Sequence, residues 1–572
     1  MAISSRRCHV GVLLCVVAAV LSKGNALLCG RTTPLVYRHP SLSLTAAGHD
    51  DWYVDDVDDT NNGGNEHLED VSYDSGDNTI NNADEDVRFY FATCIPGLAD
   101  CLVNELISFG AAHVETQGSS GVRFEGTPTV GLKTILWCRT AHKVMELIAS
   151  STDHDSVYSE GIRTSNDLYQ FCKSSIHTPS LLGNGSGGLL TLSVSTTYAS
   201  KVPKELCHSH YTALTVKNAL VDSVRELRDD GERPDVDVYD ADVPLVAVIR
   251  GRRLDSGRRR DWMQRDRNNQ HYDASFQAEE EENLVADVDI YRCLHSGGSA
   301  HRRGYRKMSS EDSDDAVIHR AAMKESLAAG LLLQAGWAKL VNAARADGKG
   351  AVLIDPMAGS ATLPVEAALI ACDMAPGLSR IASWRSGDGT RNPHRYPPAI
   401  RWKNFSDLET WDKLLNDAKS RAMAGMKFAG STMGNGQRNV SIYCNEKNFG
   451  ALQLARSCIK NAGVSRIVSL SEGDCIDWDL DSCTIPSRTI FVSNPPWGKR
   501  LSQDIDDSWV NLREFIRREA PGCEVWVLSG NKDLTKILRM KKSKSLTIKT
   551  AEEELKWLQY HVFQKREVHA ET

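Results

Sequence analysis

The sequence predicts an α/β protein in two parts: an α+β region over residues 88–300 and, over 301–572, a domain with a mostly parallel sheet covered by helices. Apolar runs at 351–355, 440–444 and 490–493 each end in a short loop, and the first two loops lead into helical spacing, which is typical of a parallel sheet. Before residue 300, strand-like and helix-like segments alternate without that repeat. A chain of 572 residues, 41% of them hydrophobic, can form separate cores in both parts.

The first 46 residues have the composition of a targeting leader. Arg6 and Arg7 precede an apolar run from Val10 to Leu21, which is a signal-peptide pattern and is short for a membrane span. Residues 27–46 carry Arg, Ser and Thr but no acidic residue, as transit peptides do. This order predicts a bipartite leader to a plastid or apicoplast-like organelle, with a mitochondrial or cytoplasmic location as the alternative, and no membrane attachment of the mature protein.

Residues 47–87 predict a disordered acidic linker. Positions 50–86 hold fourteen Asp and Glu and no Lys or Arg. Such a segment cannot bury enough apolar surface to offset its ordering entropy. The net charge of −8 therefore comes from this segment, and the remainder of the chain is weakly basic, which suits a polyanionic partner without requiring one.

The cysteine pattern argues against a metal centre. The chain has 15 Cys but no Cys-x-x-Cys, and His208 and His210 lack the spacing of a metal motif. We therefore predict free thiols, no metal and a reducing final compartment. The sequence gives no indication of the oligomeric state.

Residues 88–300 predict short strands and amphipathic helices. The run from Arg88 to Cys94 is rich in β-formers, and the helical spacing from Leu98 to Phe109 ends at Gly110. The segment 252–283 contains consecutive Arg and consecutive Glu residues, which predicts a solvated insertion. The other predicted elements are helices at 132–139 and 211–228 and strands at 114–116, 121–124, 143–148, 189–195, 234–238 and 244–250.

Several motifs of this region resemble a known family in their order along the chain. They are the strand from Arg88, the segments Leu136 to Ala141 and Ser209 to Leu214, Lys217, and Leu294 to Gly297. Together they resemble the THUMP-containing half of bacterial 23S rRNA guanine-N2 methyltransferases. The resemblance implies that 88–300 is a THUMP-type RNA-binding region with a ferredoxin-like part, and that Lys217 contacts RNA.

Residues 301–306 form a basic run with one aromatic residue, and a helix is predicted from Lys324 to Val341. In the same family an Arg-Gly-Tyr-Arg element precedes the catalytic domain. The resemblance makes Arg303, Tyr305 and Arg306 candidate contacts to RNA or cofactor. The alternative interpretation is ordinary surface charge.

The apolar run 351–354 ends in Asp355-Pro356 and continues through a loop of small residues into a helix. Strand, small-residue loop and helix form the first unit of a Rossmann-like sheet, where Gly359 and Ser360 allow a cofactor to approach the backbone. Methyltransferases that this loop resembles have glycine where this chain has Ala361. We expect that methyl group to lie beside the cofactor.

Two further acidic residues follow predicted strands. Glu446 comes after the strand 440–444, where a carboxylate typically accepts ribose hydroxyls, and Asp474 follows the strand 467–470, where an acid commonly accepts from the adenine amine. A helix N-cap or surface charge is the alternative for either residue alone.

The strand 490–493 ends in Asn494-Pro495-Pro496-Trp497, a motif of amine methylases that act on adenine N6, guanine N2 or glutamine. Asn494 can accept one N–H of a planar amine and the Pro495 carbonyl the other, Pro496 stiffens the loop, and Trp497 offers a flat face to a flipped base. Both bonds favour a pyramidal nitrogen with its lone pair toward the methyl donor. A simple turn after a strand is the alternative.

The run Asn494 to Leu501 resembles the Asn-Pro-Pro-Tyr-Gly-x-Arg-Leu element of the same guanine-N2 family, with Trp497 in place of Tyr. The resemblance covers 320–565 and implies a class I S-adenosylmethionine-dependent methyltransferase domain. We predict a transferase that methylates guanine N2 in organellar large-subunit rRNA. Alternatives are a tRNA guanine-N2 or adenine-N6 methyltransferase and a catalytically idle RNA-binding ribosome assembly factor.

Overall fold

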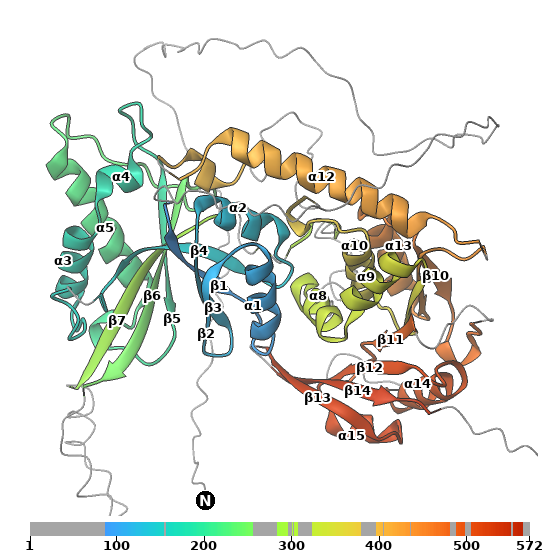
Figure 1. Ribbon diagram of the computed structural model, residues 1–572. Helices are drawn as coiled ribbons and strands as arrows, with labels where there is room; N and C mark the ends of the chain where they lie inside the picture. Colours follow the sequence, from blue (N-terminus) through green and yellow to red (C-terminus); the bar gives the residue numbers. More distant parts are fainter. Residues whose placement is uncertain are drawn as a thin grey trace, which may run out of the picture. The chain divides into compact units, whose positions relative to one another are not determined.

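Two sheets organise the chain, one between residues 88 and 293 and the other between 351 and 561 (Figure 1). The computed structural model describes residues 86–153, 156–254, 283–295, 300, 302–306, 323–378, 396–403, 405–434, 436–480, 488–497, 505–550 and 553–563. The predicted leader at 1–46, nearly all of the predicted linker at 47–87 and nearly all of the predicted insertion at 252–283 lie outside these residues.

The first sheet has seven strands in the order β2-β3-β1-β4-β7-β6-β5, and its pairs are antiparallel except β5 with β6. The strands are β1 (Arg88–Thr93), β2 (Ala112–Gln117), β3 (Gly121–Gly126), β4 (Lys143–Ser150), β5 (Leu192–Tyr198), β6 (Val243–Arg253) and β7 (Leu284–Cys293). The helices are α1 (Ala99–Ser108), α2 (Pro128–Trp137), α3 (Ser165–Ser175), α4 (Thr178–Leu182), the 3-10 helix η1 (Lys204–Leu206) and α5 (Ser209–Leu227).

One strand prediction in this region is wrong. The segment 234–238 forms only an isolated bridge, in which Val236 pairs with Leu192. Pro234 and the acidic residues on both sides of Val236 are poor strand formers, so the alternation of valines there does not produce a strand.

The second sheet has the order β10-β9-β8-β11-β12-β14-β13. Its strands are β8 (Ala351–Asp355), β9 (Val440–Glu446), β10 (Val468–Glu472), β11 (Thr489–Ser493), β12 (Glu524–Ser529), β13 (Lys542–Lys549) and β14 (Glu554–His561). The pairs from β10 to β12 are parallel, and β14 joins β12 and β13 antiparallel. The described helices are α8 (Glu325–Gln334), α9 (Trp337–Asp347), α10 (Thr362–Ala371), η2 (Pro398–Arg401), α12 (Leu408–Gly430), α13 (Phe449–Asn461), η3 (Cys475–Asp477), α14 (Ile505–Glu519) and α15 (Lys532–Ile537).

Alternate residues of the parallel strands build cores on both faces of this sheet. Leu353 and Val492 pack with α8, α9, α10 and α13, whereas Ile354 and Phe491 pack with α14 and α15. All five residues of β8 are buried, as expected for a central parallel strand. The predicted fold class is therefore confirmed: an α+β region followed by a mostly parallel α/β sheet.

We predict that Gly425→Ala destabilises the protein and Gly430→Ala does not, although both glycines lie in α12. A Cβ atom at Gly425 would lie 1.8 Å from the carbonyl oxygen of Cys372, whereas a Cβ at Gly430 would meet nothing within 4 Å. The first substitution must displace backbone, at a cost of about 1–3 kcal/mol. Thermal unfolding of both variants checks this, and equal melting temperatures would contradict the close approach of α12 to the end of α10.

Candidate active site

Four loops of the second sheet meet at one edge. In the parallel register, Asp355 lies opposite Cys444, Glu472 opposite Glu446, and Ile354 opposite Phe491. The strand order reverses at β8, which has β9 on one side and β11 on the other. Ligands of open α/β sheets bind at the carboxyl ends of the strands beside such a reversal. The predicted site residues lie at the ends of these strands or on the loops after them: Asp355 to Ser360, Glu446, Asp474 and Asn494 to Trp497.

The loop after β8 is held by a hydrogen bond from its backbone to the side chain of Glu446, the last residue of β9. Gly359 has φ 58°, and its amide donates to Glu446 Oε2 at 2.7 Å. A Cβ atom at Gly359 would meet no atom within 4 Å, so the chain is open to a ligand there. Pro356, the first residue of the loop, is buried, and Ser360 Oγ lies 3.3 Å from Thr362 Oγ1.

Ala361 differs from the expectation. It is also left-handed, with φ 58°, directly before α10. Its side chain is fully buried and belongs to the core formed with α8 and α9. The methyl group therefore packs into the core and does not line the open side of the loop. Replacing glycine here costs about 1–2 kcal/mol of backbone strain without filling the site.

Glu446 joins the loops after β8 and β9. Its Oε2 accepts from Gly359 and its Oε1 accepts from the amide of Asn448 at 2.7 Å. Burial raises the pKa of Glu446, and these backbone donors oppose that rise. A carboxylate oxygen has two lone pairs, so each oxygen can accept one more hydrogen bond, as the two hydroxyls of a ribose require.

Asp474 lies beside Glu446 at the start of η3. Its Oδ1 accepts from the amide of Ile476 at 3.3 Å, and its Oδ2 accepts from Lys447 Nζ at 3.3 Å. Burial alone would raise the pKa of Asp474, but the amide of Ile476 and the ammonium of Lys447 lower it overall. Asp474 therefore serves as a helix cap, and its carboxylate remains able to accept from a further donor.

Asp355 ends β8 and is almost fully buried. Burial raises its pKa to about 8, the amide of Met357 opposes this rise, and the nearby charge of Glu446 adds to it. Met357 donates to Asp355 Oδ1 at 3.2 Å. At neutral pH Asp355 is therefore largely protonated in this structure.

Two indole rings hold the Asn494-Pro495-Pro496-Trp497 loop. Trp509 of α14 donates through Nε1 to the Pro496 carbonyl at 2.7 Å, and Trp497 donates through Nε1 to Asn494 Oδ1 at 2.9 Å. Trp497 is half-buried and packs against the cores on both faces of the sheet. Its ring lies on Gly530, where a Cβ atom would be 2.7 Å from Cε3 and Cζ3.

The predicted RNA contacts at Arg303 and Tyr305 are wrong for this structure, because both side chains are buried. Arg303 donates to the carbonyls of Ala300 and Arg139, and its Nε lies 3.5 Å from Glu366 Oε1. Tyr305 donates to Glu366 Oε1 at 3.1 Å. A basic run is ordinarily solvated, but here Arg303 forms an ion pair, and Tyr305 a hydrogen bond, with one oxygen of a carboxylate that is itself fully buried in α10.

The other two predicted RNA contacts lie in different surroundings. Arg306 is partly buried and donates to the Met323 carbonyl and to Thr362 Oγ1, at the start of α10. Lys217 lies on α5, partly exposed. The first turn of the same helix carries the exposed Tyr211, whose ring packs edge-on against His208 and His210 at 6.0 and 5.7 Å between centroids.

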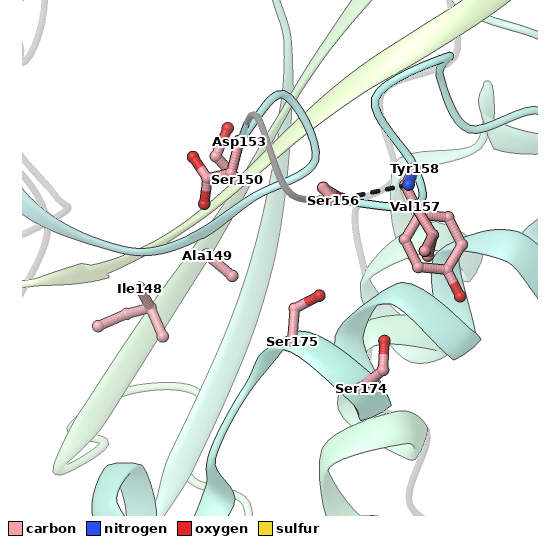
Figure 2. Close-up of a pocket in the computed structure, with 9 residues that line it drawn as sticks. All are labelled: Ile148, Ala149, Ser150, Asp153, Ser156, Val157, Tyr158, Ser174 and Ser175. Carbon is pink, nitrogen blue, oxygen red and sulfur yellow. Dashed lines mark hydrogen bonds between the residues drawn. The ribbon is translucent and has the colours of Figure 1, made fainter.

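A cavity of about 520 Å³ lies in the first region, lined by residues of β4, of α3 and of the segment between them (Figure 2). Its lining combines one carboxylate, Asp153, with serine hydroxyls and the side chains of Val157 and Tyr158. Its described lining residues include no Lys, Arg or His. Within the described ranges, no group of three or more His, Cys, Asp or Glu could hold a metal ion, and no described helix is long and apolar enough to cross a membrane.

Sequence reasoning missed three residues that shape the site. Trp509 and Gly530 position the Asn494 loop from α14 and from the end of β12. Asn445 donates through Nδ2 to the Gly473 carbonyl at 2.8 Å and so joins the end of β9 to the loop after β10. The position of Asn445 at a strand end, directly before Glu446, could have identified it from the sequence. The contacts of Trp509 and Gly530 depend on tertiary structure and could not.

The fold and the site define an S-adenosylmethionine-dependent methyltransferase domain. Gly359 leaves the backbone accessible, and Glu446 retains lone pairs for a ribose, so the residues present fit that cofactor. Residues 316–559 match the family model described as "RMKL-like, methyltransferase domain", and residues 90–145 match "RlmL ferredoxin-like domain". Residues 316–559 are therefore RMKL-like, and the residues before them include a segment that is similar to the RlmL ferredoxin-like domain.

Curated relatives agree with this assignment. The "Ribosomal RNA large subunit methyltransferase K/L" of Syntrophotalea carbinolica is 27% identical over 485 residues, covering 83% of this chain and 54% of that protein. The protein of the same name from Hydrogenovibrio crunogenus is 26% identical over 465 residues, covering 80% of this chain and 50% of that protein. The chain therefore spans about half the length of these relatives.

Solved structures share the fold. A "possible methylase" from Clostridium difficile 630 superposes with a TM-score of 0.58 at 18% identity, over 84% of this chain and 99% of that chain. SMU.472, "a putative methyltransferase complexed with SAH", superposes with a TM-score of 0.57 at 17% identity, over 84% of this chain and 99% of that chain.

We predict that Asp355→Asn gains stability relative to the natural protein as the pH rises. In the folded state the Asp355 proton is retained up to about pH 8, whereas an unfolded Asp releases its proton near pH 3.9. The contribution of Asp355 to stability is therefore fully present below about pH 4 and is lost as the pH rises to about 8.

Melting temperatures of the natural protein and the variant between pH 5 and pH 8 test this. Asp474→Asn is the matched control, because the pKa of Asp474 is lowered and its titration lies below this window. Parallel melting profiles for the natural protein and Asp355→Asn would contradict a protonated Asp355.

Proposed function

We propose that this chain transfers a methyl group from S-adenosylmethionine to the exocyclic N2 amine of a guanine in ribosomal RNA. The observation that carries the proposal is the position of Asn494-Pro495-Pro496-Trp497. This loop follows β11, which is the direct neighbour of β8, and the loop after β8 is joined to Glu446. An acceptor for an amine and a carboxylate for a ribose therefore lie on the same edge of one sheet.

Residues of the neighbouring loops would hold the cofactor. Glu446 would accept from the ribose hydroxyls, Asp474 from the adenine amine, and Gly359 would allow close approach of the backbone. When bound, S-adenosylmethionine supplies an electrophilic methyl group on a sulfonium. The protein's contribution is to orient the nucleotide and the acceptor toward each other.

The Asn494 loop suits an amine with two N–H groups. Asn494 Oδ1 accepts one N–H in our proposal, and the Pro495 carbonyl accepts the other, since the Pro496 carbonyl already accepts from Trp509. Two such bonds favour a pyramidal nitrogen, whose lone pair is no longer delocalised into the ring. A ring nitrogen such as guanine N7 has no N–H to donate, so the loop favours N2 over N7. Adenine N6 has the same donors and remains the second candidate acceptor.

The relatives support ribosomal RNA as the substrate, because their printed name is that of a large-subunit ribosomal RNA methyltransferase. Transfer RNA is the alternative substrate. We propose that the first region binds the RNA and that Lys217 and the exposed Tyr211 on α5 contact it, through charge and stacking. The organellar location and the disordered linker remain predictions, since they depend on residues before 86.

The proposal is tested by incubating the protein with methyl-labelled S-adenosylmethionine and ribosomal RNA, and by digesting the product to nucleosides. Label in N2-methylguanosine is the expected result. Label in N6-methyladenosine or N7-methylguanosine would contradict the N2 assignment, and label only on transfer RNA would contradict the substrate. Cofactor binding without methylation of either RNA would favour the idle assembly factor.

We predict that Asn494→Ala abolishes methyl transfer while the affinity for S-adenosylmethionine stays within a few fold. The substitution removes the acceptor for the amine but leaves Glu446 and Asp474 unchanged. Turnover of labelled methyl into RNA and calorimetric titration of the cofactor check the two parts. Asn416→Ala, an exposed position on α12, is the control, and full turnover of Asn494→Ala would remove Asn494 from the reaction.

A further inference from the structure

We propose that Trp497 is a positioning residue that fixes which end of the Asn494 carboxamide faces the target amine. This inference rests on the proposed function, because it assigns Asn494 as the amine acceptor. The observation behind it is the hydrogen bond from Trp497 Nε1 to Asn494 Oδ1, at 2.9 Å, within one loop.

The two ends of a carboxamide have nearly the same shape and opposite hydrogen-bonding character. Oδ1 accepts, whereas Nδ2 donates, so a half-turn of the Asn494 amide would present N–H groups to an amine that itself donates. An indole N–H can only donate. With Trp497 in place, the half-turned amide would bring two donors together, and the orientation with Oδ1 toward the indole is the one that is satisfied.

This hydrogen bond leaves the acceptor usable. Asn494 Oδ1 has two lone pairs, and the indole takes one of them. The second lone pair is left for an N–H of the substrate. Trp497 thus selects the amide orientation without blocking the acceptor.

The surroundings of Trp497 hold its ring in the required place. The ring lies on Gly530, where a Cβ atom would come within 2.7 Å of Cε3 and Cζ3 and within 3.2 Å of Leu555. Trp497 also packs against both cores, and Trp509 fixes the backbone between Asn494 and Trp497 through the Pro496 carbonyl. The folded protein therefore orders the indole before any substrate binds, so little conformational entropy is lost later.

The test uses Trp497→Phe in the full chain, which removes the donor and keeps an aromatic ring. We expect kcat on ribosomal RNA to fall about five- to tenfold, the typical effect of losing one hydrogen bond. The KM for RNA and the affinity for S-adenosylmethionine should stay within threefold. Trp478→Phe is the matched control, because Trp478 stacks on Phe515 outside this loop, and its kcat should equal that of the natural protein.

A second background distinguishes positioning from a general structural role. In Asn494→Asp both oxygens of the side chain accept, so a half-turn changes nothing, and adding Trp497→Phe should lower kcat less than twofold. A five- to tenfold loss in that background as well would overturn the proposal. An unchanged kcat for Trp497→Phe alone would also overturn the proposal. The same holds for a lower kcat that is accompanied by an equal change in the KM for RNA and by a lower melting temperature.

The natural protein's turnover separates this inference from the proposed function. If the natural protein methylates RNA and Trp497→Phe matches it, only the role of Trp497 is wrong. If the natural protein methylates no RNA, the proposed function fails first. If Asn494→Asp is inactive, Trp497→Phe alone tests the proposal. A lower kcat with an unchanged KM for RNA supports the role of Trp497, and equal changes in kcat and KM contradict it.

Discussion

Parallel pairing of β9, β8 and β11 brings together the loops that follow these three strands, which are far apart in the sequence. Because β8 has all its residues buried and is paired on both sides, the carboxyl ends of its neighbours are fixed relative to Asp355. Glu446 then joins two of these loops through the amides of Gly359 and Asn448. The orientation of the cofactor and of the target amine in our account depends on this register, since a shift by one residue would turn Glu446 to the opposite face of the sheet.

A second constraint is the buried polar cluster around Glu366. Burial raises the pKa of Glu366, while Arg303 and Arg139 oppose that rise, and Tyr305 donates a hydrogen bond to it. Arg139 also donates to the Met374 carbonyl, beyond the end of α10. Removing one partner from such a cluster typically costs about 3–5 kcal/mol. Arg303 and Tyr305, which the sequence predicts as RNA contacts, therefore anchor α10, and the loop that would approach the cofactor leads directly into this helix.

Local sequence patterns were sufficient to predict the fold class and to predict that Asp355, Glu446, Asp474 and Asn494 lie at one edge of the second sheet. Strand, small-residue loop and helix around Asp355, and acids directly after the next two strands, are contiguous signals with a physical meaning. The burial of Arg303 and Tyr305 could not be predicted, because a basic run carries no information about the distant Glu366 that it meets. The core position of the Ala361 side chain and the contact of Trp497 with Gly530 also depend on packing between segments far apart in the sequence. The strand predicted at 234–238 does not form, because Pro234 and the acidic residues beside Val236 oppose strand formation more than the alternating valines favour it.

The central claim is that Glu446 and the loop it holds form the cofactor site next to Asn494. Calorimetric titration of S-adenosylhomocysteine into the natural protein and into Glu446→Gln tests it most directly. The amide places an NH₂ where an oxygen now accepts from a backbone N–H, so we expect at least a tenfold loss of affinity. The same affinity for both proteins would contradict the account.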